Sequence, residues 1–132
     1  MMTHAEAQER GAAWARAWNA RDLESILSHF REDVTFLSPI AATVVGSPEL
    51  HGKPALRAYW QKALAGIGHL HFGFERALWD EDARELAVMY TAELDARRMR
   101  ACERMRLDAD GNAEFAEALY GSPVASPSSQ EV

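Results

Sequence analysis

The second half of the chain alternates between apolar and polar residues over four stretches. They cover residues 70–79, 85–94, 99–107 and 114–120. A period of two places alternate side chains on opposite faces of a strand, so this half is predicted to form long β-strands. The last two stretches are joined by a polar segment containing Asp110-Gly111, a strong hairpin signal. The chain is therefore predicted to fold around an antiparallel sheet.

The first half of the chain carries helical signals instead. Thr3 and Glu6 have the spacing of a capping box, and the apolar face of a first helix follows them as far as Trp18. Asp22 is a good N-cap for a second, shorter helix. Pro54 fits the first turn of a third helix.

The segment between the second and third helices is predicted to be irregular. Residues 34–37 favour a short strand that ends at Ser38-Pro39, because proline removes a donor from the strand ladder. Residues 40–52 are predicted to form a long mixed loop with a short strand at residues 43–45. Loops of this length in compact domains often form the lid or rim of a functional site.

Helices followed by long strands predict an α+β fold, in which a curved antiparallel sheet packs on three N-terminal helices. We expect residues 1–121 to form one domain, since the whole chain has 132 residues. Residues 122–132 are rich in Ser and Pro and are predicted to be a poorly ordered tail.

Composition excludes several classes of partner. The formal net charge of −6 disfavours nucleic acid and anionic membranes. Cys102 is the only cysteine, so no disulfide can form within the chain, and a reducing compartment fits. The polar residues 1–10 lack the apolar region of a signal peptide, and no apolar run reaches membrane-spanning length. These features predict a cytoplasmic protein.

One residue of the strand at residues 99–107 breaks the alternation. Glu103 stands in the middle of a face otherwise made of Met99, Ala101, Met105 and Leu107. A carboxyl in that position must be paired, hydrated, or shifted by desolvation toward its neutral form. It is thus a candidate catalytic group whose pKa should be raised. The alternative is a structural carboxyl that accepts a hydrogen bond from a buried amide or a Trp N–H.

Several short motifs together resemble one superfamily. They are Trp18-Asn19-Ala20-Arg21-Asp22, the segment from Phe30 to Phe36, Ser38-Pro39, His51-Gly52, the segment from Glu103 to Asp108, and Tyr120-Gly121. The combination resembles the SnoaL-like branch of the nuclear-transport-factor-2-like (NTF2-like) superfamily, over about residues 6–121. The resemblance implies a cone-shaped sheet, a cystatin-like roll, with a pocket between its concave face and the helices. It does not fix the function, because the superfamily includes isomerases, polyketide cyclases, dehydratases, binding modules and transport factors.

Among the enzymes of this superfamily, the site positions of ketosteroid isomerase can be compared with this sequence. That enzyme pairs an aspartate base with an oxyanion hole made of a tyrosine and a protonated aspartate. By this resemblance the base falls on Ser38, the oxyanion tyrosine on Trp14, and the protonated acid on Glu103. Two supporting tyrosines fall on Phe30 and Trp60. Serine cannot replace a carboxylate as the proton carrier, so steroid isomerisation by that mechanism is not expected.

The alternation of side chains along each strand shows which residues share a face with Glu103. Together with the resemblance, it predicts the walls of the pocket. Glu103 and Tyr90 are the candidate catalytic residues. The predicted substrate-binding residues are Trp14, Trp18, Phe36, Ser38, Tyr59, Trp60, Val88, Met99, Met105 and Tyr120. Aromatic walls around one acid are typical of a small-molecule site, although each aromatic side chain taken alone is more often a core residue.

The sequence predicts neither a metal nor a cofactor. His69 and His71 stand two apart on one strand, but they lie beside Gly68 and Gly73 at a solvent-facing strand start, and no third ligand is evident. No phosphate loop, nucleophile elbow or dinucleotide fingerprint is present.

Two classes of function follow from these residues. The first is an enzyme in which Glu103 is the general acid or base for isomerisation, cyclisation or dehydration of an apolar carbonyl compound. The second is a non-catalytic ligand-binding domain or dimeric scaffold. In either case we expect a homodimer through the outer face of the sheet, whose apolar centre would be Met89, Cys102, Phe115 and Leu119.

Overall fold

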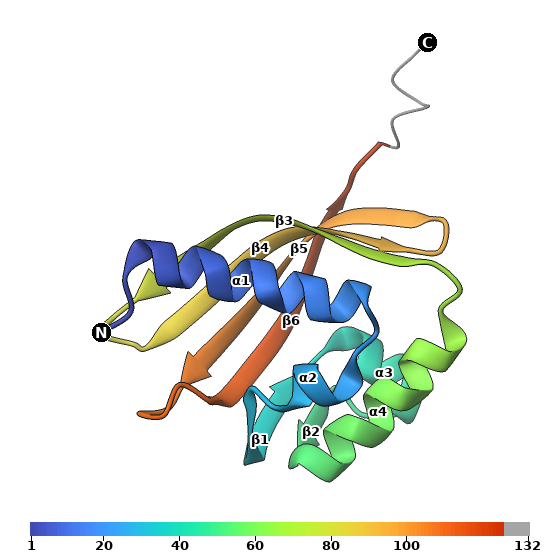
Figure 1. The fold of residues 1–132 in the computed structure, drawn as a ribbon. Helices are drawn as coiled ribbons and strands as arrows, with labels where there is room; N and C mark the ends of the chain where they lie inside the picture. The colour runs from blue at the N-terminus through green and yellow to red at the C-terminus, as the bar shows by residue number, and fades with distance from the viewer. Residues whose placement is uncertain (126–132) are drawn as a thin grey trace.

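Helices and strands alternate in the first half of the chain, and strands alone follow in the second half (Figure 1). The computed structural model describes residues 1–125. The helices are α1 (His4–Asn19), α2 (Leu23–Leu27), α3 (Pro39–Val45) and α4 (Lys53–Gly66). The strands are β1 (Phe30–Leu37), β2 (Glu49–His51), β3 (Leu70–Asp80), β4 (Glu85–Leu94), β5 (Arg97–Leu107) and β6 (Ala113–Pro123). The predicted α+β class is confirmed.

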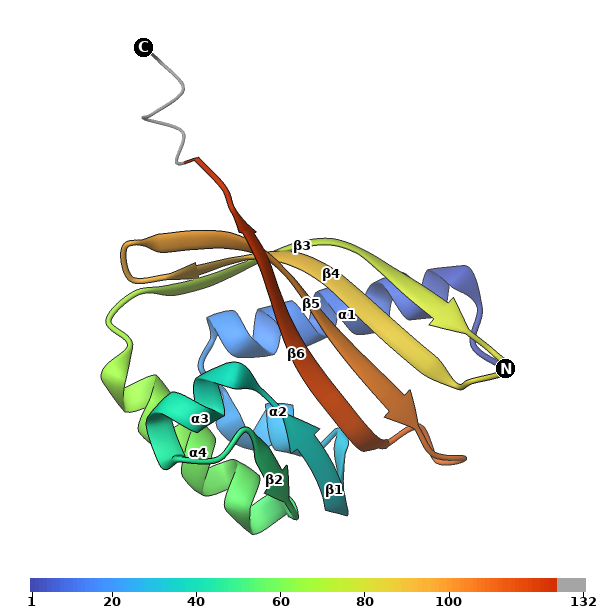
Figure 2. The same cartoon turned by 180° about the vertical axis from the view of Figure 1, so that it is seen from behind.

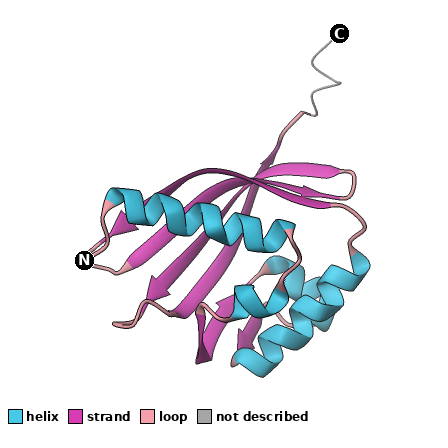
Figure 3. Cartoon of the chain, viewed as in Figure 1, coloured by secondary structure: helices cyan, strands magenta, loops and turns pink. Residues whose placement is uncertain are grey.

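The strands form a single curved sheet in the order β2-β1-β6-β5-β4-β3. Strands β3 to β6 form an antiparallel meander, whereas β1 runs parallel to β6. Helices α1 and α4 lie on the concave face, which Figure 3 shows in front of the strands. Seen from behind in Figure 2, strands β3 to β6 carry no covering helix among the described residues. Within residues 1–125, the outer face of these four strands is thus not covered by a helix.

Helix α1 begins as the sequence predicts. The Thr3 side chain accepts a hydrogen bond from the Glu6 backbone N–H, and the Glu6 side chain accepts one from the Thr3 N–H, which completes the capping box. The helix buries Gly11 against β3 so closely that a Cβ atom there would lie 2.7 Å from the ring of Phe74. Trp14 and Trp18 follow on the same buried face and reach the interior of the cone.

Two amide side chains of α1 bond the free edge of β3, which is the last strand of the sheet. Gln8 donates to the carbonyl oxygen of Ala77 at 2.7 Å and accepts from its N–H at 2.9 Å. Asn19 donates to the carbonyl oxygen of Phe72 at 3.0 Å and accepts from its N–H at 2.7 Å. Each amide therefore takes the place of a neighbouring strand at one residue of this edge.

The segment predicted as a loop contains a helix, so that part of the prediction is wrong. The Ser38 hydroxyl caps α3 by accepting a hydrogen bond from the Ile40 N–H, and Pro39 occupies the first helical turn. Gly46 ends the helix with a φ of +83°, a left-handed conformation that glycine adopts without strain. The strand predicted at residues 43–45 is absent from the described structure, and the short strand of this region is β2.

The strand boundaries differ from the predictions mainly at two places. Strand β1 begins at Phe30 rather than at residue 34, because Phe30 pairs with Ala113 of β6 and a bulge separates that pair from Thr35. Strand β6 extends to Pro123, so it includes the first two residues of the predicted tail. Residues 126–132 of that tail lie outside the described residues. Among residues 1–125, no helix is long and apolar enough to cross a membrane.

The outer face of β5 carries arginines that pair with acids across the sheet, as the alternation predicts. The pairs are Arg104 with Glu85 and Glu117, Arg106 with Glu114, and Arg100 with Glu75. The guanidinium groups of Arg104 and Arg106 also lie over the Phe115 ring, at 5.0 and 5.2 Å from its centre. The outer face of β5 thus carries these paired arginines, and the buried residues of its concave face are apolar except for Glu103.

Candidate functional site

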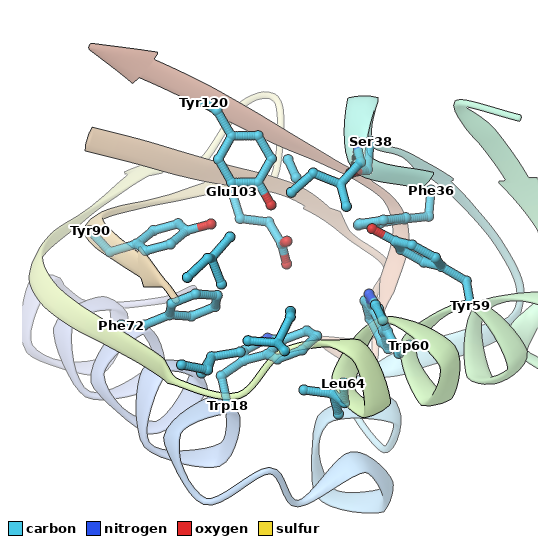
Figure 4. Close-up of a pocket in the computed structure, with 16 residues that line it drawn as sticks. Trp18, Phe36, Ser38, Tyr59, Trp60, Leu64, Phe72, Tyr90, Glu103 and Tyr120 are labelled. Atoms are coloured by element: carbon cyan, nitrogen blue, oxygen red, sulfur yellow. Dashed lines mark hydrogen bonds between the residues drawn. The ribbon is translucent and has the colours of Figure 1, made fainter. Parts of the chain in front are cut away.

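Glu103 lies at the centre of the concave face, between Val88 of β4 and Ala118 of β6. Only 3% of its surface is exposed. Its Oε2 atom accepts a hydrogen bond of 3.0 Å from the indole N–H of Trp14 on α1. A hydrogen bond from a Trp N–H was expected if Glu103 were a carboxyl with a structural role, and this bond is present. It occupies one oxygen and leaves the rest of the carboxyl facing the interior of the cone (Figure 4).

Burial sets the charge of Glu103. Loss of hydration raises the pKa of this carboxyl from 4.5 to about 8, and the hydrogen bond from Trp14 opposes the rise only in part. At neutral pH the group is therefore mostly the neutral acid. A neutral carboxyl can donate a hydrogen bond or a proton, which an ionised glutamate cannot do.

Tyrosine hydroxyls surround the carboxyl. In Figure 4 the hydroxyls of Tyr90 on β4 and Tyr120 on β6 point toward Glu103. Burial raises the pKa of both tyrosines well above the ordinary value, and the proximity of Glu103 adds to each rise. Burial also raises the pKa of Tyr59 on α4. The site is therefore a group of neutral hydrogen-bond donors at physiological pH.

Tyr90 does not lie directly opposite Glu103. The strands β4 and β5 are joined by the two residues Asp95 and Ala96, of which Asp95 has a φ of 55°. This turn pairs Tyr90 with Ala101 and places Val88 opposite Glu103. A turn centred one residue later would have paired Tyr90 with Glu103. Tyr90 approaches the carboxyl along the diagonal between the two strands instead.

A cavity of about 50 Å³ adjoins Glu103. A buried water needs roughly 10–15 Å³ of such space, so the cavity accommodates a few water molecules or a small chemical group. Its polar walls are Glu103, Tyr90, Tyr120, Tyr59, Ser38 and the two tryptophans Trp18 and Trp60. Its apolar walls are Phe36, Ile40, Ala63, Leu64, Ile67, Leu70, Phe72, Leu94 and Ala118.

The structure brings most of the predicted site residues together at this cavity, namely Glu103, Tyr90, Trp18, Phe36, Ser38, Tyr59, Trp60 and Tyr120. Four others lie elsewhere. Trp14 lies behind the cavity wall, where it bonds Glu103 and packs against Phe72 and Tyr90. Val88 is a fully buried core residue. Met99 is buried outside the cavity, and Met105 lines a separate groove beside Trp14.

Sequence reasoning missed part of the apolar wall. Ile40 belongs to α3, which was predicted as a loop, so its helical face could not be assigned. Phe72 could have been found from strand parity, since it pairs with Ala92 on the concave face. It stacks on Trp14 with ring centres 5.5 Å apart.

One donor at the cavity wall has no partner. The indole N–H of Trp18 is buried and makes no hydrogen bond within the described residues. The Trp18 ring meets the Trp60 ring edge to face, with centres 5.0 Å apart. An unpaired buried donor costs free energy, and an acceptor atom on a ligand would remove that cost.

The histidine pair has a simple environment. His69 and His71 are both exposed and both contact Glu93, at 3.6 and 3.3 Å. No group of three or more His, Cys, Asp or Glu side chains arranged to hold a metal ion occurs among residues 1–125.

Comparison with known proteins identifies the family. The sequence profile of the SnoaL-like domain matches residues 12–114. A SnoaL-like protein of unknown function from Burkholderia thailandensis E264 is similar in structure, with a TM-score of 0.80 and 33% sequence identity, over 92% of this chain and all of that one. NTF2-like and cystatin-like proteins occur among the other structural matches. No curated protein matches the sequence.

Two further structures share the fold at lower identity. TerC, co-crystallised with polyporic acid, has a TM-score of 0.70 and 16% identity over 83% of this chain and 87% of its own. SalBIII, an epoxide hydrolase/cyclase-like enzyme with a role in pyran ring formation in the polyether salinomycin, has a TM-score of 0.70 and 20% identity over 92% of this chain and 95% of its own. The cone-shaped sheet, the motifs of the sequence and the profile match agree: the chain belongs to the SnoaL-like family.

Proposed function

We propose that the protein binds an apolar carbonyl compound beside Glu103 and catalyses its isomerisation, cyclisation or dehydration, with Glu103 as general acid and base. The observation that carries this proposal is a fully buried carboxyl, with a pKa of about 8, that faces an aromatic cavity. A general acid–base group works best when its pKa is near the operating pH. Structural carboxyls in charge networks usually have lowered values instead.

The chemistry follows from the protonation states. The neutral Glu103 carboxyl and the hydroxyls of Tyr90 and Tyr120 would donate hydrogen bonds to a carbonyl oxygen as negative charge develops on it. Glu103 would give its proton to that oxygen and recover a proton from a carbon or hydroxyl of the same substrate. The TerC ligand polyporic acid and the ring-forming role of SalBIII support a cyclic or ring-forming oxygenated compound.

A non-catalytic binding domain is the alternative. Ser38 stands where a second carboxylate would have carried the proton, and its hydroxyl is used to cap α3. A single acid can still hold the oxygen of a ligand without transferring a proton. The turnover measurement that separates these two functions is given in the Discussion.

Binding itself can be tested with matched probes. We expect 2-butanone to shift the indole N–H signals of Trp18 and Trp60 in NMR spectra at about 2–10-fold lower concentration than the similarly shaped 2-methyl-1-butene, because only the ketone accepts a hydrogen bond from Glu103. The Glu103→Leu variant keeps an apolar wall without a donor and should lose this preference. Equal effects of the two probes on the wild-type protein, or no shift of either signal, would contradict the proposed binding mode.

We also propose that the chain forms a homodimer through the outer face of the sheet. Leu119 is 43% exposed there, next to the partly exposed Met89, Cys102 and Phe115, and the arginine–glutamate pairs surround them. Light scattering at micromolar concentration should give the mass of a dimer. Leu119→Glu should convert it to a monomer, whereas Val45→Glu, a change at an exposed apolar residue of α3, should not. A monomeric wild-type protein would rule the dimer out.

A further inference from the structure

The sheet has an opening beside the candidate site. Strands β1 and β6 lie side by side only as far as the pair of Leu37 with Glu117. At Ser38 the chain turns away into α3, while β6 continues to Pro123 with β5 as its neighbour on the other side. Within the described residues, no strand covers this side of β6 after Glu117.

A groove of about 600 Å³ occupies this opening. Three of its walls, Leu37, Glu117 and Leu119, belong to the outer face of the sheet, and Pro39, Pro48 and Glu49 form its far side. Three further walls, Ser38, Ala118 and Tyr120, also line the cavity beside Glu103. Residues of both faces can line one hollow only where the sheet is interrupted, because strand side chains alternate between the faces. The groove and the cavity therefore share three wall residues.

The two spaces differ in size. The cavity of about 50 Å³ accommodates only a small group, whereas the groove beside it is about 600 Å³. Ala118, which lies between them, is the cross-strand neighbour of Glu103. A carbonyl group at Glu103 would therefore be only one residue away from the groove.

We propose that the groove is the second compartment of the binding site. This inference rests on the proposed function, and it specifies the substrate class as an elongated molecule. Its carbonyl end lies in the cavity at Glu103, and its apolar remainder passes between Ser38 and Tyr120 along the Pro39 and Pro48 side of the groove, away from Leu119 of the proposed dimer interface. The groove walls are mainly leucine and proline, and the two carboxylates of Glu49 and Glu117 stand at its edge. The remainder is thus apolar and carries no negative charge.

On the opposite side of the cavity, several hydrogen bonds fix the backbone between α4 and β3. There the side chain of Arg21 donates to the backbone carbonyls of Leu64, Ile67 and Gly68, at 2.9–3.1 Å. Asp95 accepts hydrogen bonds from the N–H groups of Gly68 and His69. Passage of a long ligand on this side would have to break five hydrogen bonds to backbone groups. On the groove side Ser38 makes two: its hydroxyl accepts one from the Ile40 N–H, and its own N–H donates one to the Pro48 carbonyl.

The test uses two methyl ketones that differ in chain length, 2-butanone and 2-decanone. Both should shift the indole N–H signals of Trp18 and Trp60, and 2-decanone should bind at least tenfold more tightly. Glu49→Trp fills the groove, so it should reduce the affinity for 2-decanone to that for 2-butanone without changing the latter. Ala65→Trp, the matched control at an exposed residue of α4 that lines neither the cavity nor the groove, should leave both affinities within twofold.

Three results would overturn the inference. They are a loss of 2-decanone affinity in Ala65→Trp but not in Glu49→Trp, a loss in neither variant, or equal affinities for both ketones in the wild-type protein. If neither ketone binds, the proposed function fails, and the groove is tested separately. For this, decyl methanethiosulfonate is added to a Ser38→Cys protein that also carries Cys102→Ser. The thiolate forms a mixed disulfide and methanesulfinate leaves. Glu49→Trp should slow this labelling at least tenfold, and slowing by Ala65→Trp alone would overturn the inference.

Discussion

Replacing Glu103 with glutamine should lower the turnover of a true substrate by about 10²–10⁴-fold, the usual contribution of a general acid–base group. Glutamine keeps the shape of the side chain and an oxygen that accepts the Trp14 hydrogen bond, but it cannot transfer a proton. Binding of the substrate should change little. The measurement is kcat together with the dissociation constant, and Glu114→Gln, an ion-paired glutamate of the outer face, serves as the matched control.

The other outcomes of this experiment identify the alternatives. If wild-type protein and Glu103→Gln bind the same ligands and neither converts them, the protein is a binding domain. If the variant fails to fold while Glu114→Gln folds normally, Glu103 serves to maintain the interior of the cone. Only loss of turnover in a folded variant that still binds supports the enzyme.

The same substitution should change how stability depends on pH. Glu103 has a pKa of about 8 in the folded protein and 4.5 as its ordinary value. Between these two pH values the unfolded chain releases this proton and the folded protein keeps it. Stability therefore falls as pH rises through this interval and is constant on either side of it. At about 1.4 kcal/mol per pKa unit, the loss is about 5 kcal/mol in total.

Urea denaturation of both proteins at several pH values measures this effect. The difference in unfolding free energy between Glu103→Gln and the wild-type protein should grow in favour of the variant from pH 4.5 to pH 8. Other titrating groups contribute equally to the two proteins and cancel in the difference. Parallel curves would mean that Glu103 titrates as an ordinary glutamate, and the argument from its raised pKa would then fail.

The sequence predicted those elements whose signals are local. The capping box at Thr3 and the period-two alternation of the last four strands do not depend on distant residues, and both are present in the structure. Glu103 could be singled out for the same reason, because a single carboxyl interrupts an otherwise apolar face. Its buried position and its Trp14 partner were then accessible to simple physical reasoning.

Elements that depend on competing signals were not predictable. Ser38-Pro39 both ends a strand and starts a helix, and the sequence alone gave no way to choose, so α3 and the cavity residue Ile40 were missed. The register of β4 on β5 depends on which residue adopts a positive φ in the turn, and Asp95 does so. Because Ser38 lies where β1 ends, missing α3 also hid the opening in the sheet.

The two amides that bond the edge of β3 have a consequence for the chemistry of the site. Gln8 and Asn19 stand on either side of Trp14 in α1, and each is fixed to a backbone group of the same strand. A helix attached at both ends can neither slide nor turn on the sheet. A slip of one residue would move the Trp14 indole by about 1.5 Å along the helix axis and rotate it by about 100°. Gln8 and Asn19 therefore fix the position of the Trp14 indole that donates to Glu103. In this way they influence the proton affinity of a carboxyl that neither of them contacts.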